Sequence, residues 1–459
     1  MAAGATPASI AAWIEERSGD YDALARRIWE NPEPAYAEAA SSALHRDRLA
    51  ASGFRVAECP EMANSFVAER GSGPPLIGLM GEYDALPGMS QACSTRRESL
   101  VPGGPGHACG HNLLGVGSLA AAEALAAAAQ AAGLAGTVRY YGCPAEEALG
   151  RIPLVRAGRF SDLDAALTWH PADVNTPHRY ATSANLALVF RFSGRASHAA
   201  LAPHAGRSAL DAVQLMNLGI EFLREHVERG VLLHYVISDG GRRPNIVPDA
   251  AATSLYVRAP RAEGVRAALK RVMKIARGAA LMTETSFAVE VTHGKCDFIP
   301  NDTIHGTILR AMAAIPTPRH SVEERAFARA LAATVGRKER GATLAMIGAP
   351  ESLLKGAIHE DFGDFGAGFR VGGSLDTGDV SYVAPTGQMN TATWPLGVGA
   401  HTWQSCAASG STQAFKAARW AASVLAAAGY ALMADPVLLA AARAEHRRSA
   451  RPWRSTMDL

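Results

Sequence analysis

The sequence predicts an α/β protein whose larger domain has a mixed sheet flanked by helices and is interrupted by a smaller α+β domain. The chain has 459 residues, more than one ordinary domain usually holds. In residues 1–182, short apolar segments that end in polar residues alternate with long helical segments, a pattern typical of α/β domains. In residues 183–297 the order becomes strand, helix, strand, strand, helix, strand, as in ferredoxin-like units. We therefore predict a larger domain of residues 1–182 and 298–459, with 183–297 inserted.

The composition excludes several classes of protein. Hydrophobic residues make up 48% of the chain, and many are alanines in helical segments such as 119–132, which indicates packed helices. The net charge is +2 without a basic stripe, so we expect no nucleic-acid partner. We predict no membrane span and no secretory signal, because apolar runs occur only in alanine-rich helices and the N-terminus lacks a basic region. Six scattered cysteines fit a reducing compartment, so the expected location is cytoplasmic.

Helices in the first part are predicted where apolar residues recur at helical spacing, and strands where short apolar or β-branched runs end in turn residues. The predicted helices are 8–30, with a break at Ser18-Gly19, then 36–51 and 111–132. The predicted strands are 54–56, 65–68, 75–82, 137–144 and 164–171.

The inserted segment and the last part follow the same rules. In the insertion we predict strands over 185–192, 232–238, 252–258 and 285–291, and helices over 207–228 and 262–278. After it we predict helices over 303–314, 321–334 and 409–428, a strand over 391–394 and an irregular Gly/Asp-rich loop over 355–380.

Polar residues that could carry chemistry follow three predicted strands. Glu82 and Asp84 follow the strand that begins near residue 75, Glu146 and Glu147 follow the next, and His170 ends the third. Ligand sites of open α/β sheets lie at the carboxyl ends of strands, so these side chains are candidates for one site. Adjacent carboxylates suit a hydrolytic site, because one can bind a metal while its neighbour takes a proton. Each group also has a simpler reading, as a polar turn or as acids at a helix N-terminus.

The segment GGPGHACGHNL, residues 104–114, carries His107, Cys109 and His111 at alternate positions between glycines. In an extended segment, Cys109 and His111 would point the same way. Thiolate and imidazole are ligands that zinc and similar transition metals prefer. The alternative is a glycine-rich loop with a buried cysteine and two surface histidines.

Together these segments resemble the M20 metallopeptidase family, within it the amidohydrolase branch that contains plant auxin-conjugate hydrolases, and in that branch most of all the aminobenzoyl-glutamate hydrolases. The likeness covers nearly the whole chain. It rests on GEYDALPG (81–88), GHACGHNLLG (106–115), PAEE (144–147), WHP (169–171), SHAALAPHAGRSALDAV (197–213), PNIVPD (244–249), GDVSYVAPT (378–386) and HTWQ (401–404).

The resemblance implies a zinc-peptidase-like catalytic domain and a lid/dimerisation domain at 183–297. It also implies two divalent metal ions per chain, with Mn or Zn expected. The metal ligands it implies are Cys109, His111, Glu147, His170 and His401. The other roles it implies are Glu146 as general acid/base, His198 at the substrate carbonyl or oxyanion, Asn245 in substrate binding and Asp84 in orienting ligands.

The implied function is metal-dependent hydrolysis of the amide bond of N-acyl or N-aroyl amino acids, such as p-aminobenzoyl-glutamate, by metal-activated water. Its partners would be a small-molecule substrate and a second copy bound through the lid domain, or a homologous second subunit. The same site could instead hydrolyse a non-peptide C–N bond, such as that of an aromatic amine. Two positions depart from relatives: Asn112 replaces a common Asp, and Glu82 stands where other branches have a metal-binding His. Glu82 is therefore not among the predicted ligands.

Two other classes compete with a metal-dependent hydrolase. A cysteine-nucleophile hydrolase would pair Cys109 with His107 or His111, but nucleophile and base usually come from distant parts of a chain. A dimerising relative without chemistry would have been expected to lose one of the ligands or Glu146, and all are present.

Overall fold

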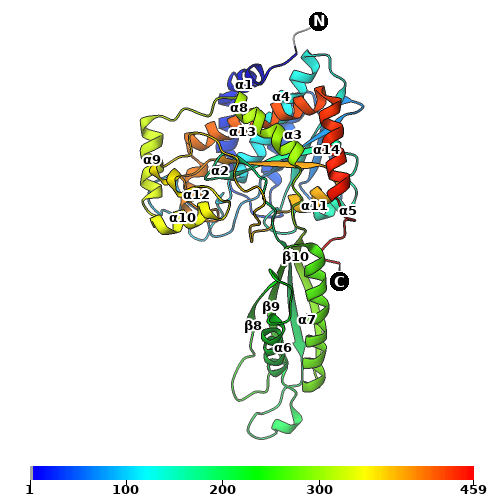
Figure 1. Ribbon diagram of the computed structural model, residues 1–459. Coiled ribbons are helices and arrows are strands. Elements are labelled where there is room, and N and C mark those ends of the chain that lie inside the picture. Colours follow the sequence, from blue (N-terminus) through cyan, green and yellow to red (C-terminus); the bar gives the residue numbers. More distant parts are fainter. Residues whose placement is uncertain (1–3, 459) are drawn as a thin grey trace. The chain divides into compact units, whose positions relative to one another are not determined.

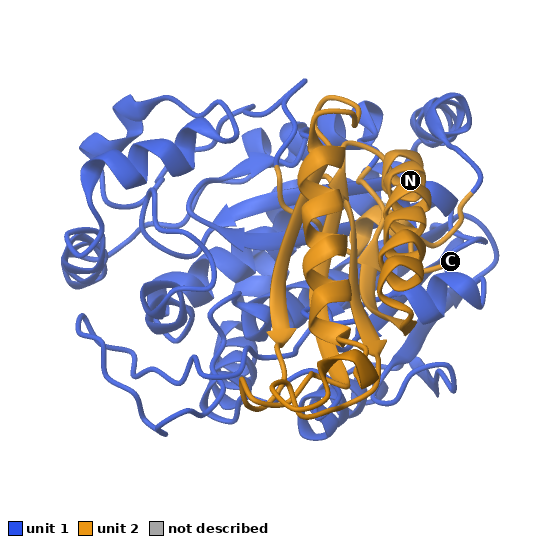
Figure 2. Cartoon of the chain, turned by 90° about the horizontal axis from the view of Figure 1, so that it is seen from below, with its two compact units in different colours: residues 1–181, 299–371, 380–452 blue, residues 182–298, 372–379, 453–459 orange. Residues whose placement is uncertain are grey.

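A computed structural model describes residues 4–458 of the chain. The chain divides into two compact units, coloured separately in Figure 2. Unit 1 consists of residues 1–181, 299–371 and 380–452. Unit 2 consists of residues 182–298, 372–379 and 453–459. Each unit contains its own sheet, and the predicted α/β class is confirmed.

The sheet of unit 1 is mixed, with strand order β1-β2-β4-β3-β5-β11-β6 within the described residues. Figure 1 shows helices packed around this sheet. The four inner strands β4, β3, β5 and β11 are parallel, whereas β1, β2 and β6 join the ladder antiparallel. The strands are β1 (Arg55–Glu58), β2 (Phe66–Ser72), β3 (Leu76–Glu82), β4 (Gly136–Cys143), β5 (Ala165–Ala172), β6 (Thr176–Pro177) and β11 (Thr386–Ala392). Because the inner strands are parallel, their carboxyl ends meet at one edge of the sheet.

Two long helices, α4 (His111–Ala131) and α13 (Thr412–Ala434), pack against each other and against this sheet. Their many alanines allow this close packing, and most of their residues are buried. Both helices are long and apolar enough to cross a membrane, but 94% and 83% of their apolar windows lie inside the fold. Such burial is typical of core helices in a globular protein.

Of the remaining helices, those within residues 7–51, 302–314 and 322–332 lie where the sequence predicts, whereas those within 152–156, 337–355, 377–383, 403–409 and 436–449 match no predicted helix. Ser18-Gly19 does separate the first two helices, and Thr6 and Ser9 form a capping box at the start of α1. The short helices α10 and η2 were not predicted; α10, with sequence RKERGATLA, has little apolar periodicity. The helices are α1 (Pro7–Glu15), α2 (Ser18–Glu30), α3 (Ala39–Ala51), α5 (Ile152–Arg156), α8 (Asp302–Ala314), α9 (Val322–Ala332), α10 (Arg337–Ala345), η2 (Glu351–Lys355), α11 (Thr377–Val383), α12 (Trp403–Ser409) and α14 (Pro436–Ser449).

Unit 2 has the predicted ferredoxin-like arrangement. Its antiparallel sheet has the order β10-β7-β9-β8, and two helices connect the strands. Its elements are β7 (Ala184–Ser193), η1 (Pro203–Ala205), α6 (Ala209–Arg224), β8 (Leu232–Asp239), β9 (Ala250–Ala259), α7 (Ala262–Thr283) and β10 (Ser286–Lys295). Leu186, Leu188, Phe190 and Phe192 alternate along β7 and are all buried, as a half-covered sheet requires.

Candidate metal centre

The chemically active side chains of unit 1 gather at the carboxyl ends of the parallel strands. Glu82 ends β3, Glu146 and Glu147 follow β4, and His170 lies near the end of β5. The segment before α4 brings in Cys109, and the helix itself begins with His111. His401 comes from the turn before α12.

Gly110 allows the backbone between Cys109 and His111 to pass close to the end of β5. Its φ is +73°, a conformation that favours glycine, and a Cβ at this position would lie 2.8 Å from Cβ of Pro171. The segment can therefore pass directly over the end of β5. As a result, Sγ of Cys109 lies 3.5 Å from Nε2 of His170.

Asp84 organises two of the candidate ligands. Its Oδ1 accepts a hydrogen bond of 2.9 Å from Nδ1 of His111, and its Oδ2 accepts one of 2.9 Å from the backbone N–H of Glu147. The first bond fixes the imidazole so that Nε2 faces the other acidic groups. The sequence predicts this orienting role for Asp84, and it stays a prediction for the metal-loaded protein.

Glu147 and His401 meet on the other side of Cys109. Nε2 of His401 lies 3.1 Å from Oε1 of Glu147. The turn that presents Glu147 contains Ala145 at φ +53°, and the backbone N–H of Ala145 donates to Oε1 of Glu38 over 2.8 Å. The His401 side chain is 52% exposed, so this side of the cluster faces solvent, whereas Cys109 and Glu146 are buried.

The candidate donors form three sets, and within each set all donor atoms lie within 4.8 Å of one another. Together the sets contain the five predicted ligands, Glu146 and Glu82. The sets are Cys109–His111–His170, Cys109–Glu147–His401 and Glu82–His111–Glu146. Three of their buried atoms have no hydrogen-bond partner in the described part of the chain: Nε2 of His111, Oε1 of Glu147 and Oε2 of Glu82. Unpaired buried polar atoms are costly, so a cation fits among these residues, and mixed sulfur, nitrogen and oxygen donors suit a transition metal.

The protonation of these groups shows the same need for positive charge. Burial would raise the pKa of the Cys109 thiol, but the neighbouring imidazoles of His111 and His170 lower it well below its usual range. Burial would lower the pKa of His170, but the Cys109 thiolate raises it to about 9. The adjacent thiolate of Cys109 and carboxylate of Glu147 raise the pKa of His401 to about 10. Burial and the charge of Cys109 raise the pKa of Glu147 to about 7. The raised pKa values of His170, His401 and Glu147 thus all reflect the negative charge concentrated around Cys109.

Two residues of the cysteine segment have structural contacts. His107 is buried, and its Nε2 lies 3.2 Å from the carbonyl oxygen of Ile28. Asn112 lies in the first turn of α4, whose N-cap is Gly110, and its amide donates to the carbonyl oxygens of Ala25 and Ser409. Asn112 therefore ties the start of α4 to neighbouring helices.

Arg151 is a residue of the centre that no sequence motif predicts. Its side chain is fully buried and donates to Oε1 of Glu82 over 2.5 Å. A single arginine after a glycine turn resembles a surface residue in the sequence, so only the buried contact reveals it.

Two predicted residues, His198 and Asn245, belong to unit 2. Both are exposed, and a backbone hydrogen bond of 3.0 Å from Ala199 N to Asn245 O joins their segments. Nδ1 of His198 accepts from the backbone N–H groups of Ala200 and Leu201, each at 3.2 Å. This leaves Nε2 of His198 as an N–H donor in the neutral ring.

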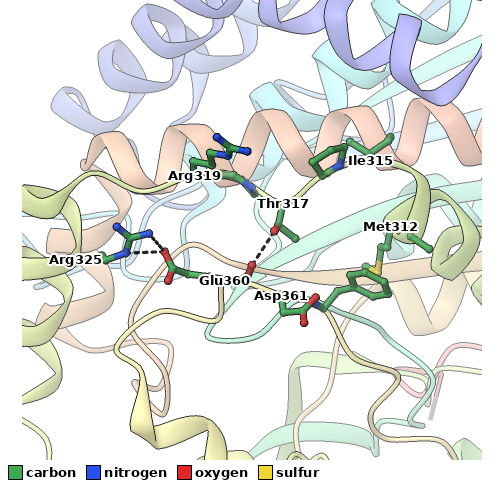
Figure 3. Close-up of a pocket in the computed structure, with 11 residues that line it drawn as sticks. Met312, Ile315, Thr317, Arg319, Arg325, Glu360 and Asp361 are labelled. Atoms are coloured by element: carbon green, nitrogen blue, oxygen red, sulfur yellow. Dashed lines mark hydrogen bonds and ion pairs between the residues drawn. The ribbon is translucent and has the colours of Figure 1, made fainter.

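Figure 3 shows a different hollow in unit 1, with a volume of about 420 Å³, near the end of α8 and the start of α9. Arg325 and Glu360 form an ion pair of 2.8 Å there, and the Thr317 hydroxyl donates to the carbonyl oxygen of Glu360. None of the residues that line it is a predicted site residue. Because Arg325 and Glu360 are paired with each other and no predicted site residue lies there, we do not assign this hollow to the reaction.

Comparison with known proteins identifies the class. The signature of peptidase family M20/M25/M40 matches residues 78–444, so the chain belongs to this family. It is therefore a hydrolase of the M20 type, and the resemblance seen in the sequence is confirmed.

The relatives with curated names act on amide C–N bonds. The chain is 38% identical over 449 residues to the B component of the p-aminobenzoyl-glutamate hydrolase of Escherichia coli, covering 95% of this chain and 93% of that protein. It is 32% identical to mouse Xaa-Arg dipeptidase over 63% of this chain and 67% of that protein. These relatives give no support to hydrolytic deamination, the alternative considered from the sequence.

Solved structures share the fold. A Bacillus subtilis protein described as a dinuclear metal binding peptidase of the M20 family has a TM-score of 0.57 and 16% identity, over 92% of this chain and 99% of that one. An aminobenzoyl-glutamate utilization protein from Klebsiella pneumoniae has a TM-score of 0.56 and 16% identity, over 89% and 97%. At this identity the likeness concerns the fold alone.

Proposed function

We propose that this protein hydrolyses the amide bond of N-acyl or N-aroyl amino acids of the p-aminobenzoyl-glutamate type and uses two divalent metal ions. One observation carries the proposal: the donor atoms of Cys109, His111, Glu147, His170 and His401 converge at the strand ends beside Glu146. The substrate class is supported by the 38% identity to a component of a p-aminobenzoyl-glutamate hydrolase over nearly the whole chain.

The ligands would divide into two groups that share Cys109. One ion would be held by Cys109, His111 and His170, and the other by Cys109, Glu147 and His401. A thiolate common to both groups suits two closely spaced cations, because its negative charge offsets their repulsion. Mn or Zn is expected from the mixed sulfur, nitrogen and oxygen donors.

Bound ions would lower the pKa of a water molecule and polarise the substrate carbonyl. Glu146, buried beside the ligands, would accept the proton of the attacking water and return it to the leaving amine. His198 would donate its Nε2–H to the oxyanion, since its Nδ1 is already held by two backbone N–H groups. Asn245, on the neighbouring segment, would bind the substrate.

The assembly and location are part of the same proposal. Unit 2 would serve as the lid and as the dimerisation domain, and unit 1 would be the catalytic domain. The partner would be a second copy or a homologous chain, because the chain also resembles the A component of the same hydrolase, in a homologue from Haemophilus influenzae. A cytoplasmic location fits the free cysteines.

The direct test is release of p-aminobenzoate from p-aminobenzoyl-glutamate by purified protein supplied with Mn²⁺, with and without a chelator. Turnover that the chelator abolishes and Mn²⁺ or Zn²⁺ restores is the expected result. No turnover by protein that binds metal would contradict the substrate assignment. A parallel assay that adds the purified A component of the Escherichia coli hydrolase would reveal dependence on a second chain.

A second assay separates this chemistry from a cysteine-nucleophile reaction. Thiol alkylation would inactivate either kind of enzyme, since Cys109 is a proposed ligand. Chelation distinguishes them, because only a metal-dependent enzyme loses activity with the chelator and regains it with added metal. Full activity in metal-free protein would contradict the proposed role of the ions.

A further inference from the structure

Glu82 is a buried carboxylate that the proposed reaction does not use. Its side chain is 4% exposed, and one oxygen, Oε1, accepts a hydrogen bond from the guanidinium of the fully buried Arg151. Burial of an ion pair is costly unless the remaining polar atoms also find partners. The second oxygen of Glu82 therefore also needs a partner.

This second oxygen, Oε2, faces an unpaired nitrogen. It lies 3.2 Å from Nε2 of His111, and in the described chain neither atom has a hydrogen-bond partner. Because Nδ1 of His111 donates to Asp84, Nε2 is the ring atom that faces Glu82. A metal ion bound at this point would contact both Nε2 of His111 and Oε2 of Glu82, and the two residues belong to one set of candidate donors.

The spacing also fits a shared metal ion. Zinc bonds to nitrogen and oxygen are about 2.0–2.2 Å long, so two ligand atoms on one ion are about 3.0–3.4 Å apart in octahedral or tetrahedral geometry. The separation of 3.2 Å between Oε2 of Glu82 and Nε2 of His111 lies in this range. Glu146 lies close enough to contribute to the same set of donor atoms.

We propose that Glu82 is a further ligand of the metal centre and that Arg151 is the positioning residue that directs its free oxygen toward the ion shared with His111. The inference rests on the proposed two-ion function. It adds a carboxylate ligand to the five proposed ligands and gives the buried arginine a role.

Arg151 is suited to this role by its charge and its geometry. The centre buries the carboxylates of Glu82, Asp84 and Glu146 within a short distance. A guanidinium is always protonated, so it offsets part of this negative charge without competing for the metal as a neutral base would. By holding Oε1 it leaves only Oε2 free to bind the ion.

The test compares metal binding by the wild-type protein and Glu82→Gln, a change that keeps the shape of the side chain. Equilibrium dialysis with Mn²⁺ gives stoichiometry and affinity, and the visible absorption of Co²⁺-substituted protein reports the ligands directly. We expect the variant to bind one of its two ions at least about 10-fold more weakly and to show a shifted Co²⁺ spectrum. Glu123→Gln is the matched control, because Glu123 is another buried carboxylate paired with an arginine, Arg48, and belongs to none of the donor sets.

The outcomes separate this inference from the proposed function. Wild-type protein that binds no metal would overturn both. Two tight ions in the wild type with the same affinities and the same Co²⁺ spectrum in Glu82→Gln would overturn the role of Glu82 and leave the proposed function standing. If Glu82→Gln does not fold, Glu82→Asp gives the same test, since the shorter side chain withdraws the oxygen but keeps the charge.

Arg151 is tested by two variants with the same readouts. Arg151→Met is expected to lower the affinity for the ion that Glu82 binds and to shift the Co²⁺ spectrum. Arg151→Lys, which keeps a positive charge, is expected to retain much of the wild-type affinity. A merely structural ion pair would lower the unfolding temperature of Arg151→Met and leave the Co²⁺ spectrum of the folded protein unchanged. That second pattern would overturn the positioning role.

Discussion

The carboxylate of Asp84 holds His111 with one oxygen and the backbone of Glu147 with the other, each through a hydrogen bond of 2.9 Å. One side chain thus sets the positions of two proposed ligands, one from each proposed metal group. The strand end and the turn after β4 depend on each other at this point, because moving Asp84 would displace both ligands.

Asp84→Asn is predicted to weaken metal binding about 10- to 100-fold, the usual cost of losing a partner of a ligand imidazole. The amide can accept only through its single oxygen, so either His111 or Glu147 faces an NH₂ group. Isothermal titration with Zn²⁺ measures the change, and circular dichroism checks that the fold is retained. An unchanged affinity would contradict the orienting role of Asp84.

Glu146→Gln is predicted to lower kcat for p-aminobenzoyl-glutamate by about 10²- to 10⁴-fold, because the amide cannot carry the proton from water to the leaving amine. Metal content measured by atomic emission should remain at the wild-type level. Loss of the metals in this variant would mean that Glu146 acts as a ligand. Nearly intact activity would show that another group moves the proton.

Gly110→Ala is predicted to destabilise the fold and to disturb the metal centre. The left-handed backbone alone costs about 1–2 kcal/mol with alanine, and crowding against Pro171 adds about 1–3 kcal/mol. Gly53→Ala is a matched control, since Gly53 has φ +81° and no atom from residues 4–458 lies within 4 Å of a Cβ placed there. Urea unfolding should show the larger loss for Gly110→Ala, and only this variant should lose metal affinity. Equal losses would contradict the importance of the contact with Pro171.

His45 is predicted to make the protein less stable in mild acid. It is buried beside the rings of Tyr83 and Tyr140, and burial lowers its pKa to about 4. In the unfolded chain, the imidazole of His45 is protonated as the pH falls below about 6.5, whereas in the folded protein it stays neutral down to about pH 4. The stability that the neutral ring contributes is therefore complete above pH 6.5 and is lost as the pH falls toward 4. The loss amounts to about 3 kcal/mol.

Urea unfolding at several pH values between 4 and 7 checks this prediction for His45. The unfolding free energy of His45→Gln should depend less on pH than that of the wild type over this range. His226→Gln, which removes an exposed histidine, controls for the general effect of losing one imidazole. If the unfolding free energies of the wild type and His45→Gln change in parallel with pH, the predicted role of His45 is wrong.

Much of the site could be predicted because its parts are local in the sequence. The pattern of Cys109 and His111, and the carboxylates directly after β3 and β4, identify donors whose convergence follows from a parallel sheet. The pairing of Arg151 with Glu82 was not predictable, because the two residues are 69 positions apart and depend on a buried contact. The short strand β6 and helix α10 were missed for a related reason, since tertiary packing rather than periodicity determines them.

Unit 2 is assembled from segments far apart in the sequence, which affects how the protein folds during translation. Its sheet is complete by residue 295, but residues 453–459 belong to it too, and the carbonyl oxygen of Arg454 accepts from Arg266 in α7 over 3.2 Å. The β10 strand leaves room for this tail, because a Cβ on Gly294 would lie 2.4 Å from Oγ1 of Thr456. On the ribosome, neither unit can therefore reach its final form until almost the whole chain has emerged. From residue 295 until residues 453–459 are made, unit 2 has its whole sheet but lacks its tail, an interval of about 10–30 s at common elongation rates in which its uncovered surface can aggregate.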